Sequence, residues 1–197
     1  LETSLELTTA ARALIDDQIF EWHRQAQGYK IRHVPATLPD MLKTDAMLEW
    51  EYTEHLGRTT QDAINAARDR LDWMRGSSSD FEIVIAQHEL ESMCRAEGYY
   101  RTLPCDVRIA QIERMIELVD QLYPRMRVYL YDARMIYSSP MSVFGPQLAV
   151  LYLGQNYMAF RDNQRIEGFS NHFDRVVREA RITSRELGAF LAKFLPT

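Results

Sequence analysis

The spacing of apolar residues limits the fold of this chain more than any other feature, because it changes between two periods. Up to residue 76, apolar residues recur at three- and four-residue steps, as on one face of a helix. Beyond it, the segments 81–86, 126–131, 147–153 and 157–161 have the composition and spacing of strands. The last three strands follow one another closely, which favours a mixed or antiparallel sheet. We therefore predict an α/β (α+β) fold, with N-terminal helices followed by a small sheet of about four strands and helices packed on it.

The front of the chain is expected to be helical, interrupted by one loop. Ser4 can cap a first helix, whose apolar face continues until Gly28 ends it. The segment 29–36 then has the pattern of a loop with a proline inside. Thr37 followed three residues later by Asp40 matches a capping box, so a short turn of helix is predicted directly after it.

A second capping-box pattern, Thr59 and Asp62, precedes a strongly amphipathic helix. Its apolar stripe consists of Ala63, Ile64, Ala67, Leu71 and Met74. The run Gly-Ser-Ser-Ser at 76–79 then breaks the chain and is the clearest change of composition in it. We interpret this run as the border between a helical front segment, residues 1–76, and an α/β core, residues 77–197, that pack together as one domain.

Charge and composition argue against several functions. The chain carries 23 basic and 28 acidic residues, a net charge of −5, whereas domains that bind nucleic acid usually have a basic surplus. Its longest apolar runs, such as 148–153, are far too short to span a membrane. Two cysteines without a CxxC pair indicate reduced thiols in a cytoplasmic protein. We therefore predict no membrane association, and expect any DNA contact to lie outside these residues.

No set of catalytic or metal-binding residues can be assembled from the sequence. The pair His88-Glu89 begins like the zinc-protease helix motif, but Ser92 stands where the second histidine is needed. The chain has neither a GxSxG motif nor a glycine-rich phosphate loop. Cys94 lies near His88 in sequence, although a cysteine–histidine pair is fixed by the fold rather than by spacing. We therefore predict a protein that is not an enzyme, with no catalytic residues, no bound metal and no cofactor.

Aromatic side chains offer the best candidates for contacts with a ligand, because they line pockets and interfaces as well as cores. The candidate ligand-binding residues are Trp22, Trp50, Tyr52, His88, Tyr99, Tyr100, Arg101, Tyr137 and Phe144. Core packing is the alternative for Trp22, which follows a helical stripe. The loop 137–146 contains two prolines and is apolar in its second half. We expect it to cover a pocket or a partner, with a bulged strand as the alternative.

Several short motifs follow one another in an order that resembles a known family. They are the proline-bearing segment 34–44, the helix 66–75 with arginines and small residues, the strand at 81–90 that runs into a Glu-Leu helix start, the pair Gln111-Ile112, and Phe173-Asp174 followed by Ala180. In this order they resemble the C-terminal effector and dimerisation domain that follows a Cro/repressor-type (XRE) helix-turn-helix in bacterial transcription regulators. Two departures are Ala36, where a glycine is usual, and the Ser/Met-rich loop, which has no counterpart.

The resemblance implies a dimer that reaches DNA only through another domain. A helix-turn-helix is expected upstream of Leu1, and the sequence does not begin with Met, so further residues are expected before it. Regulators of this class read two half-sites with two-fold symmetry, which implies a homodimer. The resemblance also implies an unknown small-molecule effector and carries over no catalytic residues.

We therefore predict the ligand-sensing and dimerisation domain, a regulatory domain, of a bacterial DNA-binding transcription regulator. A protein-interaction module, antitoxin-like or a scaffold, is the first alternative and requires a flat apolar surface without an enclosed pocket. A small-molecule enzyme is the second alternative and requires His88, Glu89 and Cys94 to meet in space. A helix-turn-helix within residues 37–71 is a further alternative, against which the acidic residues of this segment argue.

Overall fold

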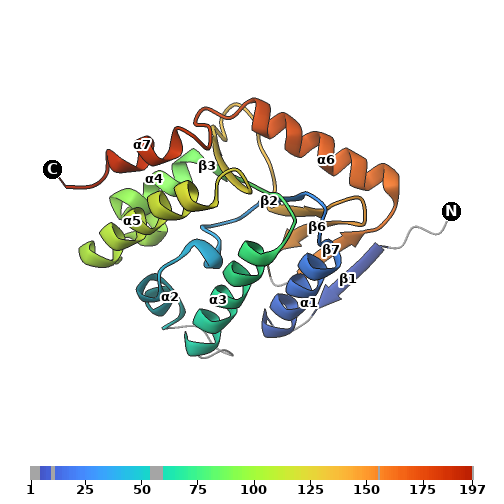
Figure 1. Cartoon of the computed structure of the whole chain (residues 1–197), viewed down its shortest axis with the longest axis horizontal. Coiled ribbons are helices and arrows are strands. Elements are labelled where there is room, and N and C mark those ends of the chain that lie inside the picture. The colour runs from blue at the N-terminus through green and yellow to red at the C-terminus, as the bar shows by residue number, and fades with distance from the viewer. Residues whose placement is uncertain (1–4, 10–11, 54–59, 155, 197) are drawn as a thin grey trace.

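A mixed sheet of seven strands organises the computed structural model, which describes residues 5–9, 12–53, 60–154 and 156–196 (Figure 1). The strands are β1 (Leu5–Thr9), β2 (Ile31–Val34), β3 (Phe81–Ala86), β4 (Met126–Tyr131), β5 (Met141–Phe144), β6 (Leu148–Leu153) and β7 (Asn156–Phe160). Their order across the sheet is β1-β7-β6-β5-β2-β3-β4. Strands β2, β3 and β4 are parallel, and the other neighbouring pairs are antiparallel. The predicted α+β class is confirmed, but the sheet has seven strands instead of about four.

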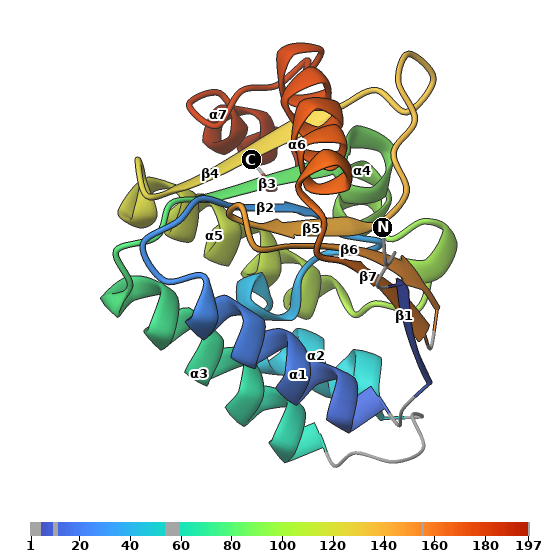
Figure 2. The same ribbon diagram turned by 90° about the vertical axis from the view of Figure 1, so that its right-hand side faces the viewer.

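Helices cover the two faces of this sheet unequally (Figure 2). They are α1 (Arg12–Gln25), η1 (Asp40–Leu42), α2 (Asp45–Tyr52), α3 (Thr60–Gly76), α4 (Gln87–Arg95), η2 (Gly98–Tyr100), α5 (Cys105–Leu122), α6 (Asn163–Arg178) and α7 (Leu187–Ala192). Apolar side chains of α1, α3, α4, α5 and α7 form the largest core with one face of the sheet, around Ile83 and Phe144. On the opposite face α6 packs Phe173 against Val34 and Val84. No helix in the described ranges combines the length and the apolar character that a membrane span requires.

Three strands form where the sequence pattern predicts helix or loop. Residues 5–9, predicted as the start of the first helix, form the edge strand β1, because their backbone pairs antiparallel with that of β7. Strand β2 lies within the predicted loop 29–36, and β5 lies within the predicted loop 137–146. Each of these two strands has four residues and ends next to a proline or a glycine, so its periodicity is too short to be recognised. Pairing on both sides stabilises them instead.

The helix signals in the sequence are right for α3, whereas the capping residue predicted before η1 is wrong. The apolar stripe predicted for α3 is buried, as expected. The capping box predicted at Thr37 and Asp40 is wrong, because η1 begins at Asp40 without a side-chain cap. The side chain of Thr44 caps α2 instead, since its hydroxyl oxygen accepts a hydrogen bond from Met47 N at 3.1 Å. The capping residue predicted at Thr59 lies outside the described residues.

The Gly-Ser-Ser-Ser run at 76–79 leads from α3 into a strand of the common sheet. Strands β1 and β2, from the front segment, pair with β7, β3 and β5 from the later one. Ser79 is buried at this crossing, where its hydroxyl oxygen accepts from Gly28 N at 2.9 Å and donates to Ala26 O at 3.2 Å. The border after residue 76 stays a prediction, while the sheet itself joins both segments.

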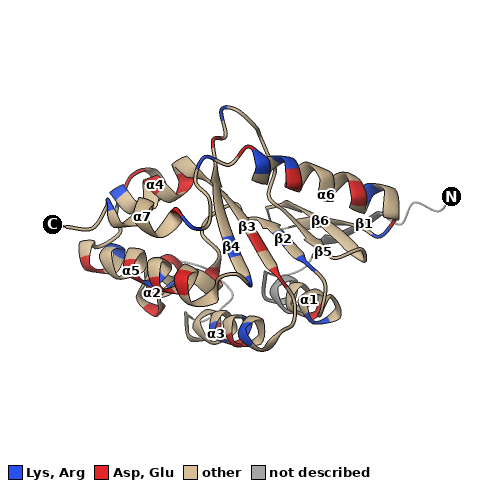
Figure 3. Ribbon diagram, turned by 45° about the horizontal axis from the view of Figure 1, so that its top comes forward, with Lys and Arg blue, Asp and Glu red and all other residues tan. Residues whose placement is uncertain are grey.

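Ion pairs tie the strands to one another and to α6 on the second face of the sheet. Figure 3 shows where basic and acidic residues stand along these strands and α6. The Glu82 carboxylate on β3 contacts Arg127 on β4 at 3.1 Å and Lys30, just before β2, at 3.2 Å. Arg32 on β2 donates from Nε to Asp174 of α6 at 3.1 Å. The basic residues at this place are therefore matched by acidic partners.

Strand β2 is the point at which the order of the strands reverses. From β2 the chain continues to its parallel neighbour β3, and it returns later on the other side of β2 as β5. In open α/β sheets, ligands bind beyond the carboxyl ends of the parallel strands. The carboxyl end of β2, at His33 and Val34, is therefore the expected place for a site.

Gly145, in the turn between β5 and β6, is expected to tolerate no other residue. Its φ is +54°, and a Cβ atom would lie 2.5 Å from Tyr29 Cβ. We expect Gly145→Ala to lower the free energy of unfolding by about 2–4 kcal/mol, since the left-handed backbone costs about 1 kcal/mol and overpacking adds about 1–3 kcal/mol. Urea denaturation measures this loss.

The matched control for this variant is Gly98→Ala. Gly98 has a φ of +56°, but a Cβ atom there would meet nothing within 4 Å. Gly98→Ala therefore has the free-energy cost of the left-handed backbone but no close contact like that with Tyr29. Equal losses of stability in the two variants would show that the contact with Tyr29 does not restrict residue 145.

Candidate ligand-binding site

A cavity of about 310 Å³ lies along β2 and the segment that follows it, on the sheet face that carries α1 and α3. Residues of β2, β3, β5 and β6 line it from the sheet, and the segment 35–41 lines it from the opposite side. Ile31, Ile83 and Leu38 are among the apolar side chains that make up most of its wall. The polar groups are few, so their positions decide what the cavity can do.

Three polar side chains from neighbouring strands meet in this cavity. His33 on β2 pairs with Ser142 on β5, and Tyr152 on β6 lies two residues beyond the partner of Ser142. All three side chains therefore point to the same face of the sheet. His33 Nδ1 lies 2.8 Å from Ser142 Oγ, which lies 3.3 Å from the Tyr152 hydroxyl oxygen. These residues, called the polar trio below, form a chain of hydrogen bonds across three strands.

Two histidines line the cavity, and burial keeps both of them neutral. Burial lowers the pKa of His33 to about 4; a hydrogen bond with the Met141 backbone opposes this shift, and the charge of Arg70 adds to it. Burial also lowers the pKa of His23, on α1, to about 3. His23 Nδ1 donates to the Ile19 carbonyl oxygen at 2.8 Å, which fixes its tautomer. Near neutral pH the two rings therefore contribute hydrogen-bonding groups and no charge.

Ser142 and His33 have the spacing of a nucleophile and its base. A general base works best when its pKa lies near the working pH, whereas the pKa of His33 is about 4. His33 is therefore a weak proton acceptor toward Ser142. The geometry favours hydrogen bonds to a bound molecule over abstraction of the serine proton.

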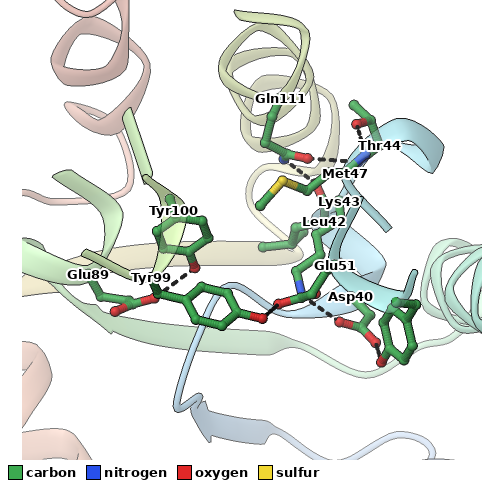
Figure 4. A network of polar contacts seen from close by, with 11 residues as sticks. Asp40, Leu42, Lys43, Thr44, Met47, Glu51, Glu89, Tyr99, Tyr100 and Gln111 are labelled. Atoms are coloured by element: carbon green, nitrogen blue, oxygen red, sulfur yellow. Dashed lines mark hydrogen bonds and ion pairs between the residues drawn. The ribbon is translucent and has the colours of Figure 1, made fainter. Parts of the chain in front are cut away.

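A network of buried charges holds the segment that closes the cavity (Figure 4). The Lys43 side chain is only 2% exposed and contacts both Asp40, at 2.7 Å, and Glu51. Asp40 also accepts a hydrogen bond at 2.6 Å from the hydroxyl of Tyr52, one of the predicted ligand residues. Burial raises the pKa of Asp40, but the charge of Lys43 and the hydrogen bonds from Lys43 and Tyr52 outweigh it and leave the pKa below its usual value. Asp40 therefore stays ionised at the edge of the cavity.

Helix α5 fixes the residues that directly follow this segment. The Gln111 side chain is fully buried; it donates to the Leu42 carbonyl oxygen at 2.9 Å and accepts from Thr44 N at 2.8 Å (Figure 4). Leu42 is the last residue of η1 and Thr44 is the N-cap of α2, so neither group has a partner within its own helix. This amide therefore anchors the wall of the cavity to the core.

Three further predicted ligand residues gather next to this network and outside the cavity. The Trp50 ring stacks on Tyr100 with centroids 6.1 Å apart and meets Tyr99 edge-on at 5.8 Å. Tyr99 donates its hydroxyl to Glu51 at 3.0 Å, and the buried Tyr100 donates its own to Glu89 at 2.7 Å (Figure 4). Both hydroxyl groups therefore donate to acidic side chains, and the aromatic cluster packs α2 against η2.

The other predicted ligand residues are dispersed over the molecule. Trp22 and Phe144 are buried core residues whose ring centroids lie 6.0 Å apart. His88 borders a separate hollow beside the ends of β3 and β4. Arg101 is exposed after η2, and Tyr137 is 73% exposed. None of the nine predicted residues lines the cavity at β2, and their part in binding stays a prediction.

The predicted loop 137–146 divides into two parts. Its second part contains β5 and belongs to the sheet. Its first part borders a groove of about 390 Å³ against α6, with Tyr137, Phe169 and His172 among the lining residues. His172 Nε2 lies 3.0 Å from Ser138 Oγ at this groove. The segment thus covers a groove with one part and forms a strand with the other.

The residues named for a small-molecule enzyme do not assemble into a site. The Glu89 carboxylate accepts a hydrogen bond from the hydroxyl of Tyr100. Burial raises the pKa of Cys94 to about 12, so its thiol is protonated and a poor nucleophile at neutral pH. His88 lies at the separate hollow with Asp132. Within the described ranges, no three His, Cys, Asp or Glu side chains are placed to hold a metal ion.

Sequence reasoning missed the polar trio as a group. His33 and Ser142 stand in segments predicted as loops, so the pairing of β5 with β2 and with β6 was not predicted. One signal was available, since Ile31 and His33 alternate directly before Pro35, as at the end of a short strand. Their contact with Ser142 follows only from the pairing of β2 with β5.

Comparison with known proteins finds similar folds only. No family model and no curated protein matches the chain. TrmBL2, an archaeal chromatin protein with a novel mode of DNA binding, is 12% identical to this chain, and the two structures superpose with a TM-score of 0.47. The match covers 89% of this chain and 49% of TrmBL2, so this chain spans about half of that protein. Nuc, a phospholipase D family member from Salmonella typhimurium, is 13% identical with a TM-score of 0.47, over 91% of this chain and 97% of Nuc. NucT from Helicobacter pylori is 8% identical with a TM-score of 0.43, over 91% and 98%.

These solved structures contradict two predictions. The predicted ligand-sensing regulatory domain of a transcription regulator is wrong, because the similar folds belong to a chromatin protein and to a phospholipase D family member. The prediction that the chain is not an enzyme is wrong on the same comparison. At 8–13% identity the likeness concerns the fold, and it assigns neither an activity nor a substrate to this chain.

The neutral state of the two cavity histidines is directly measurable. We expect long-range ¹H–¹⁵N spectra to show uncharged rings for His23 and His33 from about pH 8 down to about pH 5, where an unperturbed histidine of pKa about 6.5 is mostly protonated. Burial is the reason, because it holds the two pKa values at about 3 and about 4. His33→Gln assigns the signals. Protonation of either ring near pH 6.5 would contradict this prediction.

The same shift sets the pH dependence of stability. Between about pH 6.5 and about pH 4 the unfolded chain binds protons at these positions that the folded chain does not bind. The free energy of unfolding is therefore expected to fall as the pH decreases through this range. His33→Gln should reduce the slope of that fall.

Proposed function

We propose that this chain binds a small organic molecule in the cavity along β2. The convergence of His33, Ser142 and Tyr152 in one cavity is the observation that carries the proposal. Pockets for small molecules are mostly apolar, contain a few placed polar groups and measure about 300–1,000 Å³. The cavity has this composition, and its volume of about 310 Å³ lies at the lower end of that range.

The surroundings of the cavity support the same function. It lies along β2, where the parallel strands of the sheet meet the antiparallel ones. Two histidines with strongly lowered pKa values line it, and such groups gather at functional sites. Lys43 and Gln111 hold the segment that closes it. A wall that is already ordered lowers the entropy cost of binding.

A fragment screen tests this proposal. Saturation-transfer NMR detects binding of small organic molecules to the full chain, and Thr37→Trp fills the cavity that Thr37 lines. We expect cavity binders to lose affinity by roughly tenfold or more in this variant, because the larger side chain occupies their space. The matched control, Ser139→Trp, places the same side chain in the groove beside Tyr137 and should leave their affinity unchanged.

Two results of the screen would contradict the proposal. Binding that is lost in Ser139→Trp and kept in Thr37→Trp would place the ligand in the other groove. A diverse library without a single binder that Thr37→Trp blocks would show that the cavity takes no such ligand. Circular dichroism and urea denaturation check that both variants are folded.

The homodimer is a separate proposal. Exposed apolar side chains, Met135 and Tyr137 at 73% each, offer a surface that a second copy would cover. We expect light scattering at micromolar concentration to give twice the chain mass of 23.0 kDa. The mass of a single chain would contradict it. The family resemblance stays a proposal that rests on sequence motifs, and the cytoplasmic location stays one that rests on cysteine content. Binding in the cavity depends on neither.

A further inference from the structure

We infer that the ligand of this cavity is an uncharged aromatic molecule that carries a hydroxyl, amide or carbonyl group. The inference rests on the proposed function, because it names the chemical class that the same cavity accepts. Three properties of the cavity carry it: the balance of its charges, its neutral rings and the hydrogen-bonding groups of the polar trio.

The charged groups around the cavity balance one another. Arg70 and Asp40 line it with opposite charges. Asp40 is paired with Lys43, which is also paired with Glu51, so these four charges sum to zero. The Glu82 carboxylate points to the opposite face of the sheet, where it is paired with Lys30 and Arg127, so it adds no charge to the cavity. An ionised ligand would lose its hydration here without meeting a net opposite charge, which disfavours it.

The walls offer aromatic contacts without adding charge. The rings of His23 and His33 are neutral near pH 7, because burial lowers their pKa values to about 3 and about 4. His23 stacks on Phe81 with centroids 6.2 Å apart and an interplanar angle of 12°. His33 meets Tyr152 edge-on with centroids 6.5 Å apart. Ring faces and edges of this kind favour a planar aromatic partner over a flexible aliphatic one.

The polar trio supplies the hydrogen bonds. The hydroxyl groups of Ser142 and Tyr152 both donate and accept, and a neutral His33 has one donor and one acceptor nitrogen. Rotation of the hydroxyl groups lets the trio face either a donor or an acceptor. A hydroxyl, amide or carbonyl group on the ligand fits this pattern. A carboxylate or a phosphate adds a charge that the cavity does not offset.

Matched pairs of small molecules test the charge of the ligand. Benzamide and benzoate share a ring and differ in charge near pH 7, as do phenol and phenyl phosphate. We expect the uncharged member of each pair to bind by NMR titration at least about tenfold more tightly than its partner. Thr37→Trp should abolish that binding, and Ser139→Trp should leave it unchanged.

The outcomes separate this inference from the proposed function. Tighter cavity binding of benzoate or phenyl phosphate would overturn the inference and leave the proposed function standing. Cavity binders from the fragment screen that are all charged or all aliphatic would overturn it in the same way. If no molecule binds in the cavity, the proposed function fails and the inference fails with it.

Removal of single hydroxyl groups tests the polar trio. Tyr152→Phe and Ser142→Ala each delete one hydroxyl, and Tyr152→Phe keeps the ring that packs against His33. We expect each to weaken benzamide binding roughly five- to tenfold, the effect of one hydrogen bond. Toluene, which has the ring without the polar group, should bind all variants alike. Ser139→Ala is the control, and benzamide affinities equal in all variants would overturn the role of the trio.

Discussion

Strand β2 is the element on which the rest of the structure depends, because it joins two halves of the sheet that are built differently. It pairs parallel with β3 on one side and antiparallel with β5 on the other, so the parallel strands meet the antiparallel hairpins there. Its four residues bury Ile31 on one face and Val34 on the other. Directly after β2 the chain forms the segment 35–41, in which η1 begins only at Asp40, and this segment lines the cavity.

The segment over the cavity is held by polar contacts rather than by regular structure. A buried ammonium such as that of Lys43 is tolerated only because Asp40 and Glu51 both face it. Gln111 satisfies two backbone groups of Leu42 and Thr44, directly after this segment, which buried without partners would cost free energy. The aromatic cluster around Trp50 adds packing from the outside. Residues that the sequence suggested for ligand contact therefore support a wall of the site.

Burial lowers the pKa of the cavity histidines, and this decides the chemistry of the cavity. It makes His33 a weak base, which argues against activation of Ser142, and it leaves the same ring as a neutral hydrogen-bonding group. The likeness to a phospholipase D family member and to a chromatin protein extends over most of this chain at low identity. The proposal for what this chain binds therefore rests on the side chains in the cavity.

The sequence by itself determined the α+β class, the stripe of α3 and the strands β3, β4, β6 and β7, because periodicity over several residues is a local property of the chain. It did not determine β1, β2 and β5, whose stability comes from pairing with distant segments. Only the tertiary structure decided the site, since His33 and Ser142 are 109 residues apart and meet through the register of two strands. It also decided their chemistry, because the pKa of a histidine depends on the burial that the packed helices and the segment 35–41 impose.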